Sequence, residues 1–441
     1  MNSTSQNKPQ GVPQESPQLA DWLARLEALH PSEIEMGLGR VSEVASRMGL
    51  LDLASDPSRN IITIAGTNGK GSCVATLEAM ACAQGISVGA FTSPHFLHYC
   101  ERIRVNGNPV DDALVCEAFE AIEQARGEIS LTYFEFGTLA ALEVFRRQGV
   151  SVLLLEVGLG GRLDAVNIID SQIAVVTSID IDHEEWLGND REVIGAEKAG
   201  VFRAGCPAIC ADPNAPASIA RVAAETNADL WQKGERWDWQ REGNTWSWQG
   251  QTTTGEAVSV SDLVVPSLPL PSVAAALQVA TLLGWPLESV VPEIAKLSLT
   301  GRAQIIQSGD IPVWLDVAHN PAAAKLLAEH LASNPVQGKT LAVMAVMADK
   351  DIDGLLSPLI SQLDCWYCCS LPGNARAALA NSLAQDTQRM LTATGLQQSV
   401  TICDTVASGL TQALEQAQEG DRVLVLGSFF TVAEAITALS A

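Results

Sequence analysis

The sequence contains no long uninterrupted apolar run, although 47% of its residues are hydrophobic. A membrane-spanning helix requires about 18 or more consecutive apolar residues, and no segment approaches that length without a charge or a turn former. Segment 1–18 is polar and rich in Ser, Gln and Pro, and it lacks the apolar stretch of a secretory signal. We therefore expect a cytoplasmic protein without membrane contact, in which residues 1–18 form a disordered tail.

Basic residues are also scarce. Lys and Arg total 27 against 51 Asp and Glu, which gives a formal net charge of −24. Nonspecific binding to nucleic acid or to anionic membranes depends on clustered basic side chains. Nucleic acid is therefore not an expected partner, and any anionic ligand must be held by a locally positive site.

The ten cysteines lack the framework spacing that indicates disulfides. Cys73, Cys82 and Cys403 lie in apolar runs, where a thiol packs as a small hydrophobic group. Cys365 and Cys368 form a CxxC pair, but the sequence offers no second ligand pair nearby to complete a zinc or redox site. We expect these cysteines to be core thiols.

At 441 residues the chain is too long for one ordinary core. Apolar strands alternate with helix-like segments in two series, which is typical of βαβ units and parallel sheets. We expect an α/β protein with a larger domain over residues 19–299 and a smaller Rossmann-like domain over residues 300–441. The predicted strands are Ile61–Ala65, Val88–Thr92, Val152–Val157, Ile173–Thr177, Pro207–Ala211, Val313–Val317, Leu341–Ala345, Trp366–Cys369, Val400–Cys403 and Val423–Leu426.

A tryptophan-rich segment interrupts this alternation between residues 229 and 251. Trp237 and Trp239 precede the turn formers Glu242-Gly-Asn244, and Trp246 and Trp248 follow them. The period of two places each pair on one side of a hairpin. Such tryptophans more often cover a sheet than stack on a ligand, so we predict a packing role.

One Gly-rich turn carries the strongest chemical signal. The strand Ile61–Ala65 runs into Gly66-Thr-Asn-Gly-Lys-Gly-Ser72, and a helical segment follows. Backbone N–H groups at such glycines approach phosphate oxygens, and Lys70 can reach the β- and γ-phosphates. The generic P-loop pattern is not fully met, because Gly71 follows the lysine and displaces Ser72 by one position. We expect phosphate binding here rather than an ordinary glycine turn.

This segment resembles the nucleotide loop of folylpolyglutamate synthases and dihydrofolate synthases, members of the Mur-ligase superfamily in which the serine is displaced in this way. Further matching blocks follow in order, so the resemblance covers nearly everything from about residue 20 onward. They are Thr92-Ser-Pro-His95, Glu101-Arg-Ile-Arg-Val-Asn-Gly107, Thr132-Tyr-Phe-Glu135, Glu156-Val-Gly-Leu-Gly-Gly-Arg-Leu-Asp164, Asp182-His183, Glu197-Lys-Ala-Gly200, Gly301-Arg302 and Asp316-Val-Ala-His-Asn-Pro321. The resemblance implies a Mur-ligase-like central P-loop domain with a parallel sheet, followed by a Rossmann-like ligase domain.

The resemblance also implies a metal site, in which Ser93, Glu156 and His183 bind Mg²⁺ and Lys198 bears a CO₂-derived carbamate. K⁺ is a further candidate cofactor. Hard Mg²⁺ prefers oxygen, which makes His183 an unusual ligand. Judged from the residues alone, His183 is a hydrogen-bonded histidine at a strand end and Lys198 is a solvated lysine on a helix. By resemblance Lys70, His183 and Lys198 are the catalytic residues.

Substrate contacts are implied in the same way. ATP is expected at Thr67, Asn68, Gly69, Lys70, Gly71, Ser72, Ser272, Arg302 and Asp316. Ser272 stands near a position where the family usually has an asparagine, and a hydroxyl replaces the amide's donor and acceptor pair there. The pteroate is expected at Ser32, Glu33, Ile34, Glu35, Thr132, Tyr133, Phe134, Glu135, Leu163, Asp164 and Ala165. Core packing is an equally reasonable role for Tyr133 and Phe134.

Together these features predict a monomeric ligase that depends on ATP and Mg²⁺. The substrate carboxylate takes the γ-phosphate to give an acyl phosphate, and the amine of L-glutamate then displaces phosphate. We expect both dihydropteroate and reduced folates as acceptors, and closure of the two domains around ATP. Two alternatives stay open: a folylpolyglutamate synthase only, and a nucleotide-binding protein with a dead active site. The presence of the full residue set argues against the second: Lys70, Glu156, His183, Lys198 and Arg302.

Overall fold

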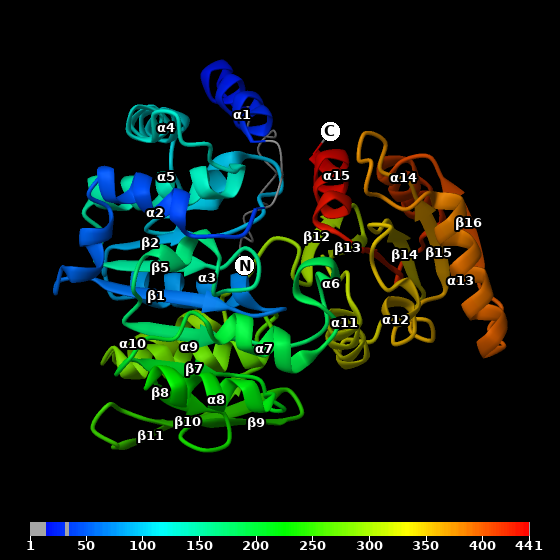
Figure 1. Cartoon of the computed structure of the whole chain (residues 1–441). Coiled ribbons are helices and arrows are strands. Elements are labelled where there is room, and N and C mark those ends of the chain that lie inside the picture. Colours follow the sequence, from blue (N-terminus) through cyan, green and yellow to red (C-terminus); the bar gives the residue numbers. More distant parts are fainter. Residues whose placement is uncertain (1–14, 31–34, 441) are drawn as a thin grey trace, which may run out of the picture. The chain divides into compact units, whose positions relative to one another are not determined.

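The computed structural model describes residues 15–30 and 35–440, which form two compact units (Figure 1). The first unit comprises Glu15–Leu297, and the second begins at Ser298. Each is built on a mostly parallel sheet with helices, so the predicted α/β class and two-domain architecture are confirmed. Helix α1 (Pro17–Leu29) begins inside the segment that we expected to be a disordered tail. No helix among the described residues is long and apolar enough to cross a membrane.

The first unit has its central strand β1 (Asn60–Ala65) between β5 (Val152–Glu156) and β6 (Ile173–Val176), parallel to both. The remaining strands are β2 (Val88–Phe91), β3 (Ile103–Val105), β4 (Asn108–Pro109), β7 (Pro207–Cys210) and β8 (Asp229–Gln232). The order is β4-β3-β2-β5-β1-β6-β7-β8, with β3 and β4 antiparallel at one edge. The carboxyl ends of the parallel strands therefore share one edge, where sites of open α/β sheets form.

Helices cover both faces of this sheet, because alternate residues of each strand point to opposite sides. Ile61 belongs to the core that α1 shares with α2, α4 and α5. Ile62 and Ile64 are buried on the other face, where α3 contacts the strands and packs against α9 and α10. The helices are α2 (Gly39–Arg47), α3 (Lys70–Ala83), α4 (Asp112–Arg126), α5 (Tyr133–Gln148), α6 (Glu184–Leu187), α7 (Arg191–Ala199), α8 (Ala217–Thr226), α9 (Leu270–Leu282) and α10 (Leu287–Ile294).

The tryptophan-rich segment forms the predicted hairpin from β9 (Asp238–Glu242) and β10 (Thr245–Gln251). A third strand, β11 (Ala257–Val264), pairs with β10 and was not predicted, although Val258 and Val260 alternate with serines. Trp246 and Trp248 are 2% and 1% exposed, on the strand that contacts helix α9. The packing role predicted for these tryptophans is confirmed.

The second unit has a six-stranded sheet in the order β12-β13-β17-β14-β15-β16, parallel except for β12. The five strands predicted from the sequence are all present, and β12 is an additional antiparallel edge. The strands are β12 (Gln304–Ser308), β13 (Ile311–Leu315), β14 (Thr340–Met344), β15 (Cys365–Cys369), β16 (Ser399–Cys403) and β17 (Arg422–Leu426). The helices are α11 (Pro321–Ser333), α12 (Ile352–Leu356), α13 (Ala380–Thr394), α14 (Val406–Gln416) and α15 (Phe429–Ser440).

All ten cysteines are free thiols. Cys365 and Cys368 are buried in β15, and burial raises the pKa of Cys368 to about 12, so this CxxC pair is inert packing. Cys82 is exposed near the end of α3, which makes its assignment to the core wrong. The apolar run around it is a helix, and only one side of a helix can face the core.

Candidate active site

The loop after β1 is held by hydrogen bonds to the segment that follows β6. The N–H of Thr67 donates to the Ser178 carbonyl at 2.8 Å, and that of Asn68 donates to Ser178 Oγ at 2.9 Å. Thr67 Oγ1 donates to the Asp180 carbonyl at 3.1 Å and accepts the Asp180 N–H at 3.0 Å. The chain leaves the sheet after Val176 and braces this loop instead.

Two glycines give the loop its shape. Gly66 and Gly69 have φ angles of +148° and +86°, in a region that side chains rarely adopt. A Cβ atom on Gly69 would lie 2.2 Å from Ser272 Oγ, which comes from helix α9. The structure therefore places Ser272 against the loop, while its contact with a nucleotide stays a prediction.

Helix α3 begins at Lys70, directly after the loop. Lys70 Nζ donates to the carbonyls of Gly66 at 3.0 Å and Thr67 at 3.4 Å, which holds the ammonium group over the loop. Ser72 Oγ, in the first helical turn, is buried without a hydrogen-bond partner among the described residues. A partnerless hydroxyl at a helix N-terminus suits a phosphate oxygen or a hydrated cation. The arrangement is that of an anion-binding site.

Ser93 lies two residues after strand β2, and Glu156 is the last residue of the neighbouring strand β5. The two residues are in contact. The N–H of Ser93 donates to Glu156 Oε2 at 3.2 Å, and Glu156 is 5% exposed. Burial and, to a smaller extent, Glu156 raise the pKa of the Cys73 thiol in α3 to about 12. A buried carboxylate thus lies beside the start of the phosphate-loop helix, where oxygen ligands suit a hard cation.

Lys198 on helix α7 is only 4% exposed, so the interpretation as a solvated lysine is wrong. Burial and then repulsion from Lys70 lower the pKa of Lys198 to about 7, against the opposite effects of Asp182 and Asp164. Its carbonyl oxygen would lie 2.9 Å from a Cβ atom on Gly161, so the α7 backbone packs tightly on the loop after β5. Much of the Lys198 amine is therefore neutral near pH 7, and the neutral amine is the form that reacts with CO₂.

His183 does not end a strand, contrary to the sequence expectation. β6 ends at Val176, and His183 lies in the loop that precedes the short helix α6. Its φ and ψ of +53° and +44° are left-handed, and its side chain is exposed. The preceding Asp182 is buried and interacts with Lys198. In this segment Asp182 is the residue that acts electrostatically on Lys198. The ligand role of His183 stays a prediction.

Asp164 organises the loop after β5. Its Oδ2 atom accepts the N–H groups of Gly158 and Leu159, both at 2.9 Å, and Oδ1 accepts that of Val166 at 3.0 Å. Burial raises the pKa of Asp164 to about 6, although these bonds and Lys70 lower it. Both oxygens serve the loop backbone, which gives Asp164 a structural role beside any contact with a pteroate. Two other expected contacts flank it, the half-buried Leu163 and the buried Ala165.

The expected acceptor segment forms the N-terminus of helix α5. Thr132 Oγ1 accepts the N–H of Glu135 at 3.2 Å, and Glu135 Oε2 accepts that of Thr132 at 2.7 Å, which completes a capping box. Arg40 donates to both oxygens of Glu135, at 3.1 and 3.3 Å, and also pairs with Glu35. Arg40 therefore ties the segment at Glu35 to the start of α5, a role that the sequence analysis missed. Three expected pteroate contacts lie outside the described residues: Ser32, Glu33 and Ile34.

Tyr133 and Phe134 are both half-buried and pack against the core of the first unit. The Phe134 ring centroid lies 5.6 Å from that of Phe91, and the Tyr133 centroid lies 5.8 Å from that of Tyr99. A Cβ atom on Gly158 would lie 2.7 Å from the Phe134 ring, so the helix start reaches the loop after β5. Half-burial serves the packing role and leaves ring surface for a substrate.

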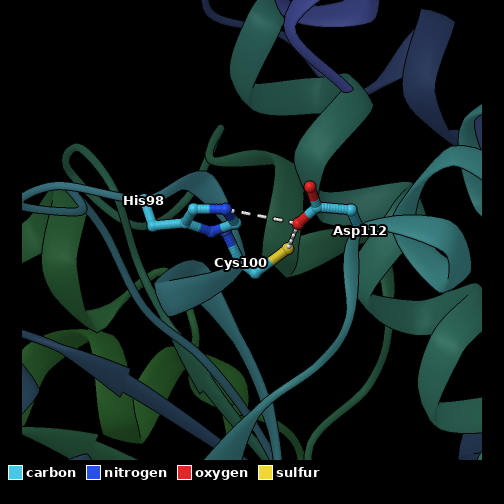
Figure 2. A group of neighbouring side chains, drawn as sticks. All are labelled: His98, Cys100 and Asp112. Atoms are coloured by element: carbon cyan, nitrogen blue, oxygen red, sulfur yellow. Dashed lines mark hydrogen bonds and ion pairs between the residues drawn. The ribbon is translucent and has the colours of Figure 1, made fainter. Parts of the chain in front are cut away.

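A further group of potential metal ligands lies in the same unit. His98, Cys100 and Asp112 each place one ligand atom within 4.8 Å of the others (Figure 2). His98 Nδ1 accepts the N–H of Cys100 at 3.2 Å, so the neutral ring carries its proton on Nε2, 3.2 Å from Asp112 Oδ1. Neither ring nitrogen then offers a lone pair to a metal. Cys100 Sγ lies 3.4 Å from the same oxygen, so the three side chains form hydrogen bonds that connect segment 98–100 to the start of α4.

Arg302 and Asp316 are neighbours within the second unit. Asp316 accepts the N–H of Ala303 at 2.9 Å and that of Ala318 at 2.8 Å. Burial raises the pKa of Asp316, and Arg302 opposes that shift less strongly. The Arg302 guanidinium carbon lies 5.4 Å from the Phe429 ring centroid. Both side chains thus have defined surroundings, while their contacts with ATP stay predictions.

Comparison with known proteins identifies the family. Residues 301–429 match the family described as Mur ligase, glutamate ligase domain. The dihydrofolate synthase/folylpolyglutamate synthase of Escherichia coli strain K12 is 43% identical over 432 residues, which are 98% of this chain and 97% of that protein. The chain belongs to the dihydrofolate synthase/folylpolyglutamate synthase family.

Solved structures of this family have the same fold. E. coli FolC in complex with DHPP and ADP has a TM-score of 0.87 at 43% identity, covering 96% of this chain and 98% of that one. The bifunctional Yersinia pestis enzyme with AMPPNP and a Mn ion has a TM-score of 0.87 at 45% identity, covering 97% and 100%. The Mur-ligase-like fold expected from the sequence is confirmed. These relatives bind an adenine nucleotide and, in the second case, a divalent metal.

Proposed function

We propose that this protein is an ATP-dependent ligase that adds L-glutamate to dihydropteroate, giving dihydrofolate, and to reduced folates, giving folylpolyglutamates. One observation carries this proposal: the phosphate loop, the buried carboxylate and the capped aromatic helix meet at one edge of one sheet. Glu156 accepts from Ser93, and Phe134 packs on Gly158, two residues after the carboxylate. Lys70 interacts with Asp164 in the same loop. The 43% identity to the E. coli enzyme supports the same activity.

The proposed chemistry needs no covalent enzyme nucleophile. The acceptor carboxylate takes the γ-phosphoryl group of ATP, and the resulting acyl phosphate reacts with the amine of L-glutamate to release phosphate. Lys70 neutralises the charge that develops during phosphoryl transfer. Tyr133 and Phe134 offer half-buried ring faces to the pterin. Arg302 and Asp316 complete the proposed ATP contacts.

Mg²⁺ is the proposed metal, with Ser93, Glu156 and His183 as its ligands. The buried Glu156 carboxylate and the partnerless Ser72 hydroxyl support this fit, since both offer oxygen to a hard cation. When bound, Mg²⁺ supplies positive charge to the phosphate oxygens. A K⁺ requirement stays a prediction, to be tested by replacing potassium with tetramethylammonium in the assay. We also propose that the protein acts as a cytoplasmic monomer.

A carbamate on Lys198 is the proposed additional metal ligand. Its support is the burial of Lys198 and a pKa of about 7, which leaves much of the amine neutral at physiological pH. Protein equilibrated with ¹³C-labelled bicarbonate should show a carbamate carbon signal by NMR. The Lys198→Arg variant cannot be carbamylated and should lack that signal. Identical spectra for the two proteins would contradict the carbamate.

The deciding experiment for the function is an ADP-release assay with three acceptors: dihydropteroate, tetrahydrofolate and a UDP-muramyl substrate. We expect release only when L-glutamate and one of the first two acceptors are both present. In the presence of L-glutamate, ADP release with tetrahydrofolate but not with dihydropteroate would indicate a folylpolyglutamate synthase only. A protein that binds ATP but turns over with none of the three would be the catalytically dead alternative.

A further inference from the structure

Arg102 is a half-buried cation without an acidic partner among the described residues. Its neighbour Arg104 pairs with Glu78 at 2.8 Å, as expected in a chain with a net charge of −24. The one side-chain hydrogen bond of Arg102 in the described part of the chain runs from Nε to His95 Nδ1, at 2.8 Å. An arginine in these surroundings can take an anion from outside the chain.

Aromatic rings fix the direction of this guanidinium group. Its central carbon lies 5.7 Å from the Tyr99 ring centroid and 5.4 Å from that of Tyr133. Tyr99 is fully buried, and His95 holds the Nε side. The two terminal nitrogens therefore keep four N–H donors in a planar fork, which matches the two oxygens of a carboxylate.

The position of Arg102 connects two parts of the proposed site. His95 lies two residues after Ser93, whose N–H donates to the buried Glu156. Tyr133 is the first residue of helix α5, the expected acceptor segment. An anion held by Arg102 would thus lie beside Tyr133 and against His95, in the segment that follows Ser93.

We propose that Arg102 binds the non-reacting carboxylate of the terminal glutamyl residue in a reduced-folate acceptor. This assignment rests on the proposed function. Dihydropteroate has a single carboxylate, which is the reacting group. A glutamylated folate has two on its last residue, so one must be held while the other is phosphorylated. Arg102 is then a specificity residue for the second activity and not for the first.

The test compares Arg102→Gln with Arg221→Gln, which removes the same charge from an exposed pair with Glu225 on helix α8. For Arg102→Gln, we expect the KM for tetrahydropteroylglutamate to rise about 10- to 100-fold, the usual effect of losing a bidentate charged contact. The KM values for dihydropteroate and L-glutamate should change less than about threefold. Arg221→Gln should leave all three unchanged. Arg102→Lys keeps the charge without the fork and should give an intermediate KM for the folate.

Equal increases with both acceptors in Arg102→Gln would make Arg102 a structural residue and overturn the assignment. A rise in the KM for L-glutamate with dihydropteroate would overturn it as well, because the bound carboxylate would then belong to the amine substrate. Turnover of dihydropteroate and an unchanged melting temperature show that the variant is folded. A wild type that ligates neither acceptor would contradict the proposed function itself, which separates the two failures.

Discussion

Lys70 and Lys198 come from different helices, yet they lie close enough for their charges to repel each other. Lys70 bonds to loop carbonyls at the helix start, while Lys198 is buried beneath the loop after β5. The repulsion favours the neutral amine of Lys198. This arrangement supports separate proposed roles for the two lysines, one as a cation for phosphate and one as a reactive amine.

Substitution of Lys70 tests the first role. We expect Lys70→Ala to abolish ligation with both acceptors, because the transferring phosphoryl group loses a cation worth several kcal/mol in such sites. Lys296→Ala removes an exposed lysine from the same unit and should be fully active. The measurement is kcat with each acceptor, together with a circular dichroism spectrum. Retention of more than about a tenth of wild-type kcat, a loss of roughly 1.4 kcal/mol, would contradict this role.

Burial of Lys198 predicts a pH-dependent stability. The pKa of Lys198 falls from 10.5 to about 7 on folding, so the unfolded chain binds more protons between these values and stability rises with pH. From pH 7 to pH 9 in CO₂-free buffer, the free energy of unfolding should increase by about 2 kcal/mol relative to Lys198→Met. Urea unfolding of both proteins measures this difference. Parallel pH profiles for the two would show that Lys198 is not desolvated.

Sequence patterns could locate residues that lie in one continuous motif, such as Lys70 or Glu156. They could not show the burial of Lys198, because its environment is made by Lys70, Asp164 and Asp182 from other parts of the chain. Arg40 was missed for the same reason, since its partner Glu135 lies 95 residues away. Pairs at that separation leave no local pattern in a single sequence.

At the scale of the element, the capping box fixes the start of helix α5, the proposed acceptor segment. Thr132→Val removes the acceptor for the Glu135 N–H and should cost about 1 kcal/mol of stability. It should also lower kcat/KM for both acceptors, because the aromatic residues follow directly. Thr405 caps α14 with a box of the same kind in the second unit.

Thr405→Val is therefore the matched control for that change. It should lose similar stability by urea unfolding while keeping the kcat/KM of the wild type. Equal activities in the two variants would show that the start of α5 does not orient the acceptor.

A second pair of matched variants compares a glycine of the phosphate loop, Gly69, with a glycine outside it, Gly243. Gly69→Ala adds a Cβ atom 2.2 Å from Ser272 Oγ at a φ of +86°, so the Ser272 hydroxyl must move and the loop backbone is strained, and ATP binding should weaken. Gly243→Ala has a φ of +62° but no neighbour within 4 Å, and it lies in the tryptophan hairpin. It should cost a similar backbone strain of about 1 kcal/mol and leave activity intact. Calorimetric titration with ATP distinguishes them, and tight binding by Gly69→Ala would contradict the geometry.

Elements with strong periodicity were predictable, and those shaped by distant contacts were not. The tryptophan hairpin follows from a period of two, whereas the short alternation of Val258 and Val260 in β11 was overlooked; its largely exposed residues pair with β10. The end of β6 was placed one residue too late, at Thr177, whose N–H still donates to the Ala65 carbonyl of β1 at 2.9 Å. Its hydroxyl actually binds the Asn68 carbonyl at 2.7 Å, which is a loop contact.

For the whole molecule, the ten free thiols predict a simple labelling pattern. Cys82 is exposed, Cys206 is half-buried and the others are buried. A thiol reagent should label one group quickly, a second slowly, and all ten only in denaturant. Cys82→Ser should lose the fast phase. Fewer than ten reactive groups in denaturant without reductant would indicate a disulfide and contradict the structure.

The brace between the phosphate loop and Ser178–Asp180 has a consequence for the energetics of nucleotide binding. Because these hydrogen bonds exist before any nucleotide arrives, the loop has little conformational freedom left to lose. The amide hydrogens of Thr67 and Asn68 should accordingly exchange slowly with deuterated solvent in the ligand-free protein. The loop is then already ordered when ATP binds. The conformational entropy of the phosphate site is therefore lost during folding rather than during binding.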